Sequence, residues 1–237
     1  MRANKYVANA TGLSRRAADA AIEQGRVRVN GEPAKPGQDV PASATVTLDS
    51  HLLQPSGQTQ TIMLNKPPGY VVSRNGQGAR TIYDLLPPEL HHLKPIGRLD
   101  KDSSGLLLLT NDGALAQKLT HPSHQKTKVY EVTLDKPLSR QHFDQITQTG
   151  VDIGDENPSK FDLIASNKQQ VISKPAAKHT CYFLPATCYW RATLTEGRNR
   201  QIRRTFAALG YNVQTLHRTR FGPYSNKNQS LGQHQKL

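Results

Sequence analysis

A run of four leucines, Leu106–Leu109, is the segment that most restricts how this chain can fold. It follows a glycine-bounded loop and ends at an Asn-Asp-Gly turn. Consecutive apolar residues closed by such a turn predict a buried strand or a short buried helix. The preceding loop carries Asp100, with Arg98 two residues earlier. Loops held on a rigid core element often carry catalytic residues, so Asp100 is a candidate nucleophile or base, although an Asp between glycines is more often a turn residue.

The charge of the chain points to a polyanionic partner. Its 237 residues include 31 Lys and Arg against 18 Asp and Glu, a net charge of +13. Such an excess favours nucleic acid, with an anionic membrane surface as the rival interpretation. No apolar run approaches the length that spans a bilayer, and the first residues do not resemble a signal peptide. We therefore expect a cytoplasmic protein without a membrane partner.

Cysteine usage argues against a metal or a disulfide framework. The two cysteines, Cys181 and Cys188, are too few for such a framework. The sequence has no CxxC and no paired Cys/His spacing, so we expect no structural zinc and no other metal site.

Residues 1–50 are predicted to form a small separate unit of two helices on a small sheet. The helices are expected over residues 5–10 and 15–24, the second with Ser14 as its N-cap. Arginines open the second helix and alternate with valines on the strand that follows it. This cationic face either binds a polyanion or only keeps the unit soluble. Its members are Arg15, Arg16, Arg26 and Arg28.

A second, larger domain is expected over residues 61–225, after a linker at 51–60 whose composition is polar and rich in turn formers. Its predicted strands are followed by isolated helices without regular alternation, which favours an α+β domain with a mixed sheet. One strand places Lys128 and Tyr130 on the same face. Residues 226–237 are polar and are predicted to be a disordered tail.

A helix predicted over residues 199–209 carries a dense group of arginines. Arginine suits phosphates and partly buried carboxylates because its planar fork donates two parallel hydrogen bonds. Arg203 lies beside the apolar stripe of this helix, so we expect it to point inward and to pair with Asp100. Arg200 and Arg204 are expected to face solvent or to contact phosphate.

Taken together, these segments resemble the bacterial ribosomal pseudouridine synthases of the RsuA type, which carry an S4-like RNA-binding domain before the catalytic domain. Three ordered motifs and the accessory unit make a chance match improbable. The resemblance implies a larger domain built on a mainly antiparallel sheet. It is carried by Leu13-Ser14-Arg15-Arg16-Ala17-Ala18, Gly25-Arg26-Val27-Arg28-Val29-Asn30-Gly31, Gly97-Arg98-Leu99-Asp100, Ser104-Gly105-Leu106-Leu107, Lys128-Val129-Tyr130 and Glu196-Gly197-Arg198-Asn199-Arg200-Gln201-Ile202-Arg203-Arg204.

The activity implied by this resemblance is isomerisation of a uridine in ribosomal RNA to its C-glycoside, without a cofactor or metal. By correspondence Asp100 is the catalytic carboxylate and Arg203 its partner arginine. Tyr130 matches the aromatic residue that holds the base and exchanges a proton. Arg98 matches a residue that related synthases insert where the uridine leaves its stack. The further candidates for RNA or substrate contact are Lys66, Lys128, Arg200, Arg204, Arg15 and Arg16.

The expected partner is ribosomal RNA or a partly assembled ribosomal subunit, with large-subunit RNA favoured over small-subunit RNA and the protein acting as a monomer. The main alternative is a non-catalytic RNA-binding factor in ribosome assembly that has the same fold. The presence of Asp100, Tyr130 and Arg203 favours catalysis, since a binding protein does not need all three. A nuclease or methyltransferase is a weaker interpretation, because the sequence has neither a metal cluster nor a glycine-rich cofactor loop.

Overall fold

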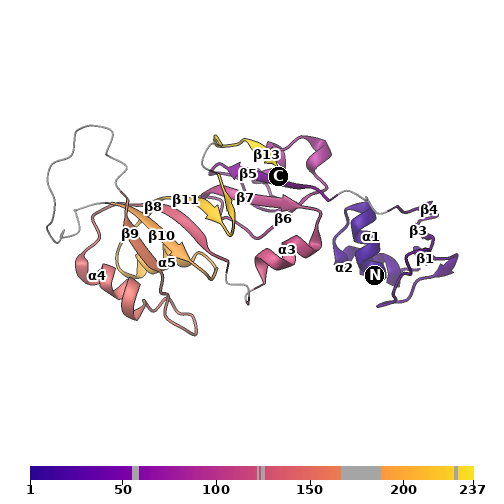
Figure 1. Ribbon diagram of the computed structural model, residues 1–237, viewed down its shortest axis with the longest axis horizontal. Coiled ribbons are helices and arrows are strands. Elements are labelled where there is room, and N and C mark those ends of the chain that lie inside the picture. Colours follow the sequence, from indigo (N-terminus) through magenta and orange to yellow (C-terminus); the bar gives the residue numbers. More distant parts are fainter. Residues whose placement is uncertain (55–58, 122, 124–125, 167–187, 227–228) are drawn as a thin grey trace. The chain divides into compact units, whose positions relative to one another are not determined.

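The computed structural model describes residues 1–54, 59–121, 123, 126–166, 188–226 and 229–237, so Cys181 and part of the expected linker lie outside the description. The chain divides into two compact units (Figure 1). The first comprises Met1–Thr61 with His92–Lys94 and Thr110–Asp112, and the second comprises the rest of the chain.

The smaller unit has the predicted two helices and a four-stranded sheet. Ser14 caps the second helix, its Oγ accepting a hydrogen bond from the Ala17 amide at 3.0 Å. The sheet has the order β2-β1-β3-β4. Apolar side chains from both helices and from the sheet form one core. The elements are α1 (Ala3–Thr11), α2 (Arg15–Glu23), β1 (Val27–Val29), β2 (Glu32–Pro33), β3 (Val46–Leu48) and β4 (His51–Leu52).

The expected linker start at residue 51 is wrong. His51 and Leu52 form β4, which pairs antiparallel with β3. The amide of Leu53 then donates to the carbonyl of Val46 at 2.8 Å, and its side chain packs on the core of the unit. The backbone hydrogen bonds of this strand and the apolar Leu53 outweigh the polar composition of the residues that follow.

The larger unit is an α+β domain, as predicted, and its described residues form one mixed sheet of order β13-β5-β7-β11-β8-β10-β9. β7 and β11 are parallel, whereas β8 pairs antiparallel with both β11 and β10. β6 and β12 pair with β7 and β11 respectively. The strands are β5 (Thr61–Lys66), β6 (Lys94–Pro95), β7 (Ser104–Thr110), β8 (Lys128–Leu134), β9 (Asp162–Ala165), β10 (Tyr189–Leu194), β11 (Val213–Phe221), β12 (Tyr224–Ser225) and β13 (His234–Lys236).

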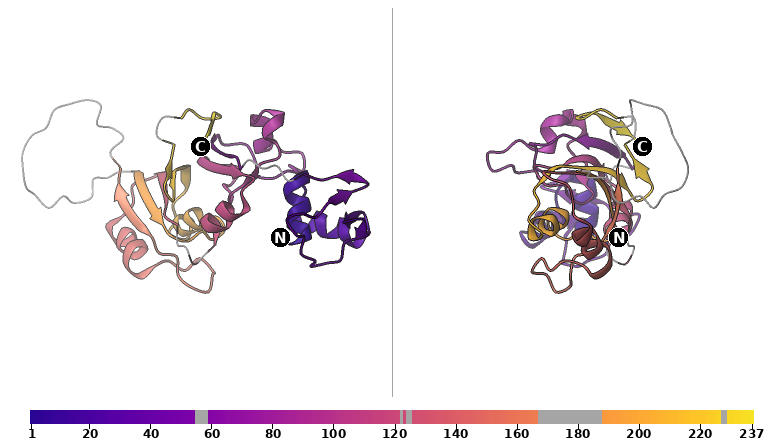
Figure 2. Two further views of the ribbon diagram at one scale, coloured as in Figure 1. Left: turned by 45° about the vertical axis from the view of Figure 1, so that its right-hand side comes forward. Right: turned by 90° about the vertical axis from the view of Figure 1, so that its left-hand side faces the viewer.

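Helices cover one face of this sheet (Figures 1 and 2). Phe206 of α5 and Ile146 of the turn after α4 pack against Trp190 and Val132 on the strands. Tyr130 contacts the edge of the same apolar cluster. The helical segments are the 3₁₀ turns η1 (Ile82–Leu85) and η2 (Pro88–Leu90), α3 (Gly113–Thr120), α4 (Arg140–Asp144) with the π-helical turn Gln145–Thr149, and α5 (Gln201–Ala208).

The four leucines form a strand rather than a helix. Leu106–Leu109 lie within β7 and are fully buried, because β5 and β11 flank the strand on both sides. Gly105 begins the apolar part of this strand with φ +111°, and a Cβ there would lie only 2.5 Å from the backbone nitrogen of Arg218. Only glycine allows the two backbones to approach this closely.

The prediction of a disordered tail is also wrong for the described part of residues 226–237. β13 pairs antiparallel with β5 and extends the sheet. The side-chain amide of Asn65 donates to the Gln229 carbonyl at 2.6 Å, and the side-chain amide of Gln229 donates to the Met63 carbonyl at 3.0 Å. These contacts join residues about 160 positions apart, and the polar side chains on β13 are exposed because it is the edge strand.

Candidate active site

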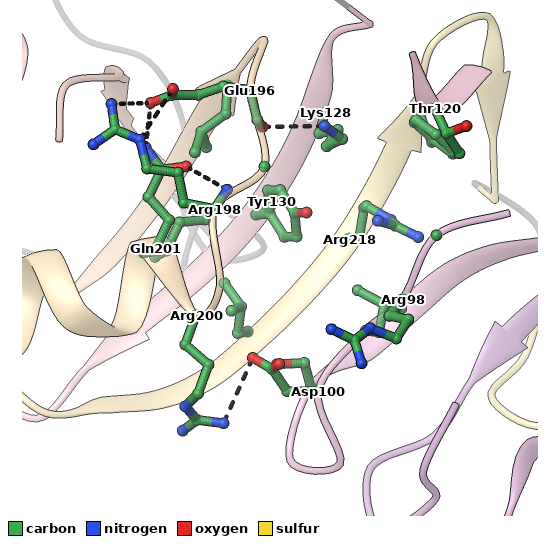
Figure 3. A pocket seen from close by; sticks show the side chains of 18 of the residues that line it. Arg98, Asp100, Thr120, Lys128, Tyr130, Glu196, Arg198, Arg200, Gln201 and Arg218 are labelled. Atoms are coloured by element: carbon green, nitrogen blue, oxygen red, sulfur yellow. Dashed lines mark hydrogen bonds and ion pairs between the residues drawn. The ribbon is translucent and has the colours of Figure 1, made fainter. Parts of the chain in front are cut away.

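A cleft of about 250 Å³ opens in the larger unit beside the loop that precedes β7 (Figure 3). Its walls come from this loop, from β8 and β11, and from the segment that leads into α5. Residues far apart in the sequence therefore meet here because three neighbouring strands end or pass at one place. The predicted residues that line it are Arg98, Asp100, Lys128, Tyr130 and Arg200.

Lys66 fixes the backbone of the loop that carries Asp100. Its side chain is fully buried at the end of β5. The ammonium donates to the carbonyl of Ser103 at 2.6 Å, to that of Asp100 at 3.1 Å and to that of Lys101 at 3.3 Å. A fourth bond goes to the Pro67 carbonyl at 2.9 Å. The prediction that Lys66 contacts RNA is therefore wrong, since the residue has no exposed atoms with which to do so.

Asp100 lies at the cleft with about a third of its side chain exposed, at 30%. The nearest cation is Arg200, whose Nη1 lies 3.6 Å from Asp100 Oδ2. Arg200 has φ +47°, a left-handed backbone conformation that is rare outside glycine and that immediately precedes α5. This conformation brings the guanidinium beside the loop, and Arg200 remains exposed, in agreement with the outward orientation predicted for it.

Asp102, two residues after Asp100, receives most of the arginine contacts. Arg200 binds it with two parallel hydrogen bonds, Nη1 to Oδ1 at 3.1 Å and Nη2 to Oδ2 at 3.2 Å. Burial raises the pKa of Asp102, but these hydrogen bonds and the charges of Arg203 and Arg200 outweigh it, so its pKa lies below the usual range. Asp102 therefore remains ionised and holds Arg200 beside the loop.

The predicted ion pair between Arg203 and Asp100 does not form. Arg203 points inward, as expected, but its Nε lies 3.3 Å from the Asp102 carboxylate. Its Nη1 donates to the Val213 carbonyl at 2.8 Å and its Nη2 to the Asp102 carbonyl at 3.2 Å. The register of α5 brings Arg203 beneath the loop. Arg200, which precedes α5, is the arginine that reaches Asp100. Arg203 thus acts on the backbone around Asp100 rather than on its carboxylate.

Tyr130 lies half-buried on the sheet face that forms the back of the cleft. In the register its Cα partners are Arg218 on β11 and Ala192 on β10. Figure 3 shows its ring between Arg198 and Arg218, with the hydroxyl directed into the cleft. Such a ring offers an apolar face for a planar base and a hydroxyl for proton exchange.

Glu196 is the other carboxylate that lines the cleft, and both of its oxygens already accept hydrogen bonds. Arg198 Nε donates to its Oε2 at 3.1 Å, and Gln201 Nε2 donates to its Oε1 at 2.6 Å. Its backbone carbonyl accepts a hydrogen bond from Lys128 Nζ at 3.1 Å. Glu196 therefore shapes the wall of the cleft, and Asp100 is the carboxylate that faces the open space.

Three predicted RNA contacts lie elsewhere. Arg204 binds Asp155 through Nη2 to Oδ1 at 2.7 Å and Nη1 to Oδ2 at 3.3 Å, so its guanidinium is not directed at the cleft, and its contact with phosphate stays a prediction. Arg15 and Arg16 are exposed on α2 of the smaller unit. Arg15 donates to the Asn4 side chain at 3.3 Å.

Two residues of this site escaped the sequence analysis, Asp102 and Arg218. Asp102 lies in the same short loop as Asp100, and a second acid there could have suggested a second arginine partner. Arg218 follows Leu216 in the two-residue alternation of a strand, which is the pattern of an inward side chain. An arginine at such a position is a signal of a buried charge.

Within the described residues, no group of three His, Cys, Asp or Glu side chains is arranged to hold a metal ion. In that same part of the chain, no helix has the length and apolarity needed to cross a membrane.

Titration of Lys66 is expected to change stability and activity in opposite directions. Burial lowers the pKa of Lys66 to about 8, against the raising effect of the Asp102 and Asp100 charges. Between about pH 8 and 10.5 the unfolded chain keeps this proton and the folded chain does not, so the free energy of unfolding should rise with pH there, by up to roughly 3 kcal/mol. A neutral amine has only two hydrogens for four carbonyls, so the loop should loosen and the turnover rate should fall.

Urea unfolding measured from pH 7 to 10 checks the first effect, with Lys66→Met as the reference because it lacks this titration. A rise of the same size in the Met variant, or no rise in the wild type, would contradict the expectation.

The sequence is similar to that of known RNA-modifying enzymes along its whole length. The profile of the RNA pseudouridylate synthase family matches residues 60–208, and that of the S4 domain matches residues 1–46. The dual-specificity RNA pseudouridine synthase RluF of Escherichia coli K12 is 36% identical over 242 residues, covering 100% of this chain and 75% of the relative. The ribosomal small subunit pseudouridine synthase A of Pasteurella multocida is 34% identical, covering 94% of this chain and 89% of the relative.

A solved structure agrees with this similarity. A crystal structure of a pseudouridylate synthase superposes with a TM-score of 0.66 at 30% identity, covering 100% of this chain and 96% of that one. The predicted family and fold class, with an S4 domain at the N-terminus and a catalytic domain on a largely antiparallel sheet, are confirmed.

Proposed function

The chain belongs to the RNA pseudouridylate synthase family, and we propose that it converts a specific uridine of ribosomal RNA to pseudouridine with Asp100 as the catalytic carboxylate. The observation that carries this assignment is the placement of Asp100. It faces the cleft, its backbone is held by Lys66, and the guanidinium of Arg200 lies beside it.

The reaction needs the groups that the cleft provides. The bond between N1 of uracil and C1′ of ribose breaks, the base rotates, and its C5 bonds to C1′. The proton on C5 is lost and N1 takes up a proton, so the product is an isomer of the substrate. Asp100, partly shielded from water, acts as nucleophile or base. Tyr130 supports the face of the rotating base and moves a proton. Arg203 is a positioning residue, because it contacts Asp102 and the Val213 carbonyl rather than the Asp100 carboxylate.

We place the target in the large-subunit RNA, presented as naked RNA or in a partly assembled subunit, and the enzyme as a cytoplasmic monomer. Asn199 and the stretch 210–213 support this choice, since they resemble the large-subunit enzymes more than the small-subunit ones. Arg98 is the residue that we expect to fill the space left by the extruded uridine, and its exposure at the rim of the cleft supports this role.

The direct test is to incubate the purified protein with large-subunit and small-subunit RNA, each as a naked transcript and in precursor particles, and to map pseudouridine by chemical derivatisation and mass spectrometry. One new pseudouridine at a single position is expected. Absence of product from all four substrates would overturn the proposed activity, and product only in small-subunit RNA would overturn the choice of target.

Arg15 and Arg16 are expected to contribute binding but not chemistry. Replacing both with Ala should weaken RNA binding and make the salt dependence of the dissociation constant shallower by about one to two counterions, because each phosphate contact releases about one. The single-turnover rate at saturating RNA should not change. Fluorescence anisotropy at several salt concentrations measures the slope.

Arg26→Ala is the matched control in the same unit, because its guanidinium is already bound to Asp49 at 2.8 Å. An equal loss in this control would show that general charge, and not the arginines of α2, is responsible.

A further inference from the structure

Arg218 is a buried cation that lines the cleft and has an unused donor. Only 3% of the residue is exposed. Its Nε donates to the Leu106 carbonyl at 2.9 Å, and its Cζ lies 5.0 Å from the centre of the Phe221 ring. Its Nη2 is buried and has no hydrogen-bond partner among the residues that the structure describes. A buried donor without a partner is costly, and an acceptor on a ligand bound in the cleft would remove that cost.

The sheet places this guanidinium next to the aromatic ring of the cleft. Arg218 and Tyr130 are directly opposite each other in the antiparallel pair of β11 and β8. Opposite residues project to the same face with their Cβ atoms about 5 Å apart. Both side chains line the cleft, and Figure 3 shows them side by side. A planar base held against Tyr130 would therefore direct one edge at Arg218.

The charges around Arg218 leave its end of the cleft cationic. Burial and the charge of Arg218 lower the pKa of Lys128, against the opposing effect of Glu196. Glu196 is bound by Arg198 and Gln201. No ion pair to Arg218 occurs within the described part of the chain, so no carboxylate there competes for its guanidinium.

This inference rests on the proposed function. We infer that Arg218 Nη2 donates a hydrogen bond to a carbonyl oxygen of the target uracil and stabilises the negative charge that forms on the base. When the bond between N1 and C1′ breaks, its electron pair remains on uracil and spreads over both carbonyl oxygens. The π electrons of the anionic ring at C5 then form the bond to C1′, and loss of the C5 proton with uptake of a proton at N1 completes the isomerisation. A fixed cation that meets charge only as it develops accelerates the bond-breaking step.

A phosphate is the less suitable occupant for this donor. Phosphates remain at the surface of an RNA strand, where exposed side chains such as Arg98 can reach them. Arg218 lies beneath the cleft surface and opposite the ring that would hold the base. The depth of the donor thus matches the base edge of an extruded nucleotide.

The first experiment compares Arg218→Met with Arg220→Met in single-turnover reactions at saturating enzyme. Arg220 lies two residues further along β11, is exposed and does not line this cleft. The Arg218 variant is expected to lose about 100-fold in rate, as other enzymes do when one stabilising donor is removed, with the RNA dissociation constant changed less than about threefold. The Arg220 variant should retain the wild-type rate. An unchanged rate in Arg218→Met would overturn the inference.

The second experiment replaces oxygen by sulfur at C2 or C4 of the target uridine, because sulfur is a poor acceptor. One of the two substitutions should slow the wild-type enzyme and have no further effect in Arg218→Met. If the rate losses from the sulfur substitution and from Arg218→Met multiply independently, the proposed contact is overturned. If Arg218→Met does not fold, the wild-type enzyme alone tests the contact. Equal wild-type rates with the natural RNA and with both thio-substituted RNAs would also overturn the inference.

A methylphosphonate at the phosphate of the target nucleotide tests the rival ligand. If this neutral linkage reproduces the loss of Arg218→Met and is without effect in that variant, the donor binds phosphate and the inference is overturned. An active wild type with a full-rate Arg218→Met leaves the proposed function intact and removes only this inference. An inactive wild type removes both.

Discussion

Replacing Asp100 with Asn is expected to lower the rate of pseudouridine formation by about 10⁴-fold or more, with RNA binding within a few-fold of the wild type. The amide has nearly the shape of the carboxylate but is neither a nucleophile nor a base at neutral pH. The loop should keep its conformation, because Lys66 binds the carbonyl of residue 100 and not its side chain. Single-turnover mass spectrometry of the modified RNA and anisotropy binding curves measure the two quantities.

Asp102→Asn is the matched control for this substitution. Asp102 lies in the same loop and carries the paired hydrogen bonds from Arg200, so the variant should loosen the loop and reduce the rate by about tenfold. Equal losses in the two variants would show that the chemistry does not depend on the carboxylate at position 100. An active Asp100→Asn enzyme would remove Asp100 as the catalytic group. No product from the wild type would favour the alternative of a non-catalytic assembly factor.

Replacing Gly105 with Ala is expected to destabilise the larger unit by roughly 3 kcal/mol or more. The new Cβ would lie 2.5 Å from Arg218 N and 2.8 Å from Arg218 C, so β7 and β11 would have to separate. The φ of +111° adds strain, because a residue with a Cβ rarely adopts it. The displacement would move both the loop before β7 and Arg218, so activity should fall even at temperatures where the unit remains folded.

Urea unfolding followed by tryptophan fluorescence measures this effect selectively. The chain contains one tryptophan, and Trp190 is buried on β10 in the core of the larger unit. Gly113→Ala is the control, because it begins α3 without a positive φ and a Cβ there meets no atom within 4 Å. An unfolding midpoint in Gly105→Ala equal to that of the control would contradict the close approach of the two strands.

The elements that the sequence predicted well depend on local pattern. The leucine run, the Ser14 cap and the alternation on β8 each encode their structure within a few residues. The family motifs likewise led to Asp100 and Tyr130, which the structure places in one cleft. Asp100 and Tyr130 could thus be identified as candidates from the sequence alone.

The contacts that the sequence did not reveal are those between distant segments. The sequence around Lys66 does not distinguish it from a surface lysine, but in the structure a loop some 35 residues later surrounds its ammonium. The arginine next to Asp100 was expected to be Arg203 and is Arg200, because a helical pattern does not report the left-handed residue that precedes α5. The final strand was missed because edge strands are polar, and its partner β5 lies about 170 residues earlier.

The hydrogen bonds from Lys66 to the loop also affect the energetics of RNA binding. These hydrogen bonds form when the polypeptide folds, before any nucleic acid arrives, so the entropy of ordering the loop is lost in advance. The free energy of association with RNA is then available for everting a nucleoside from its helix. As such enzymes diverge toward new RNA targets, the residues at the rim of the cleft can accordingly change while the preorganised loop that carries Asp100 is kept.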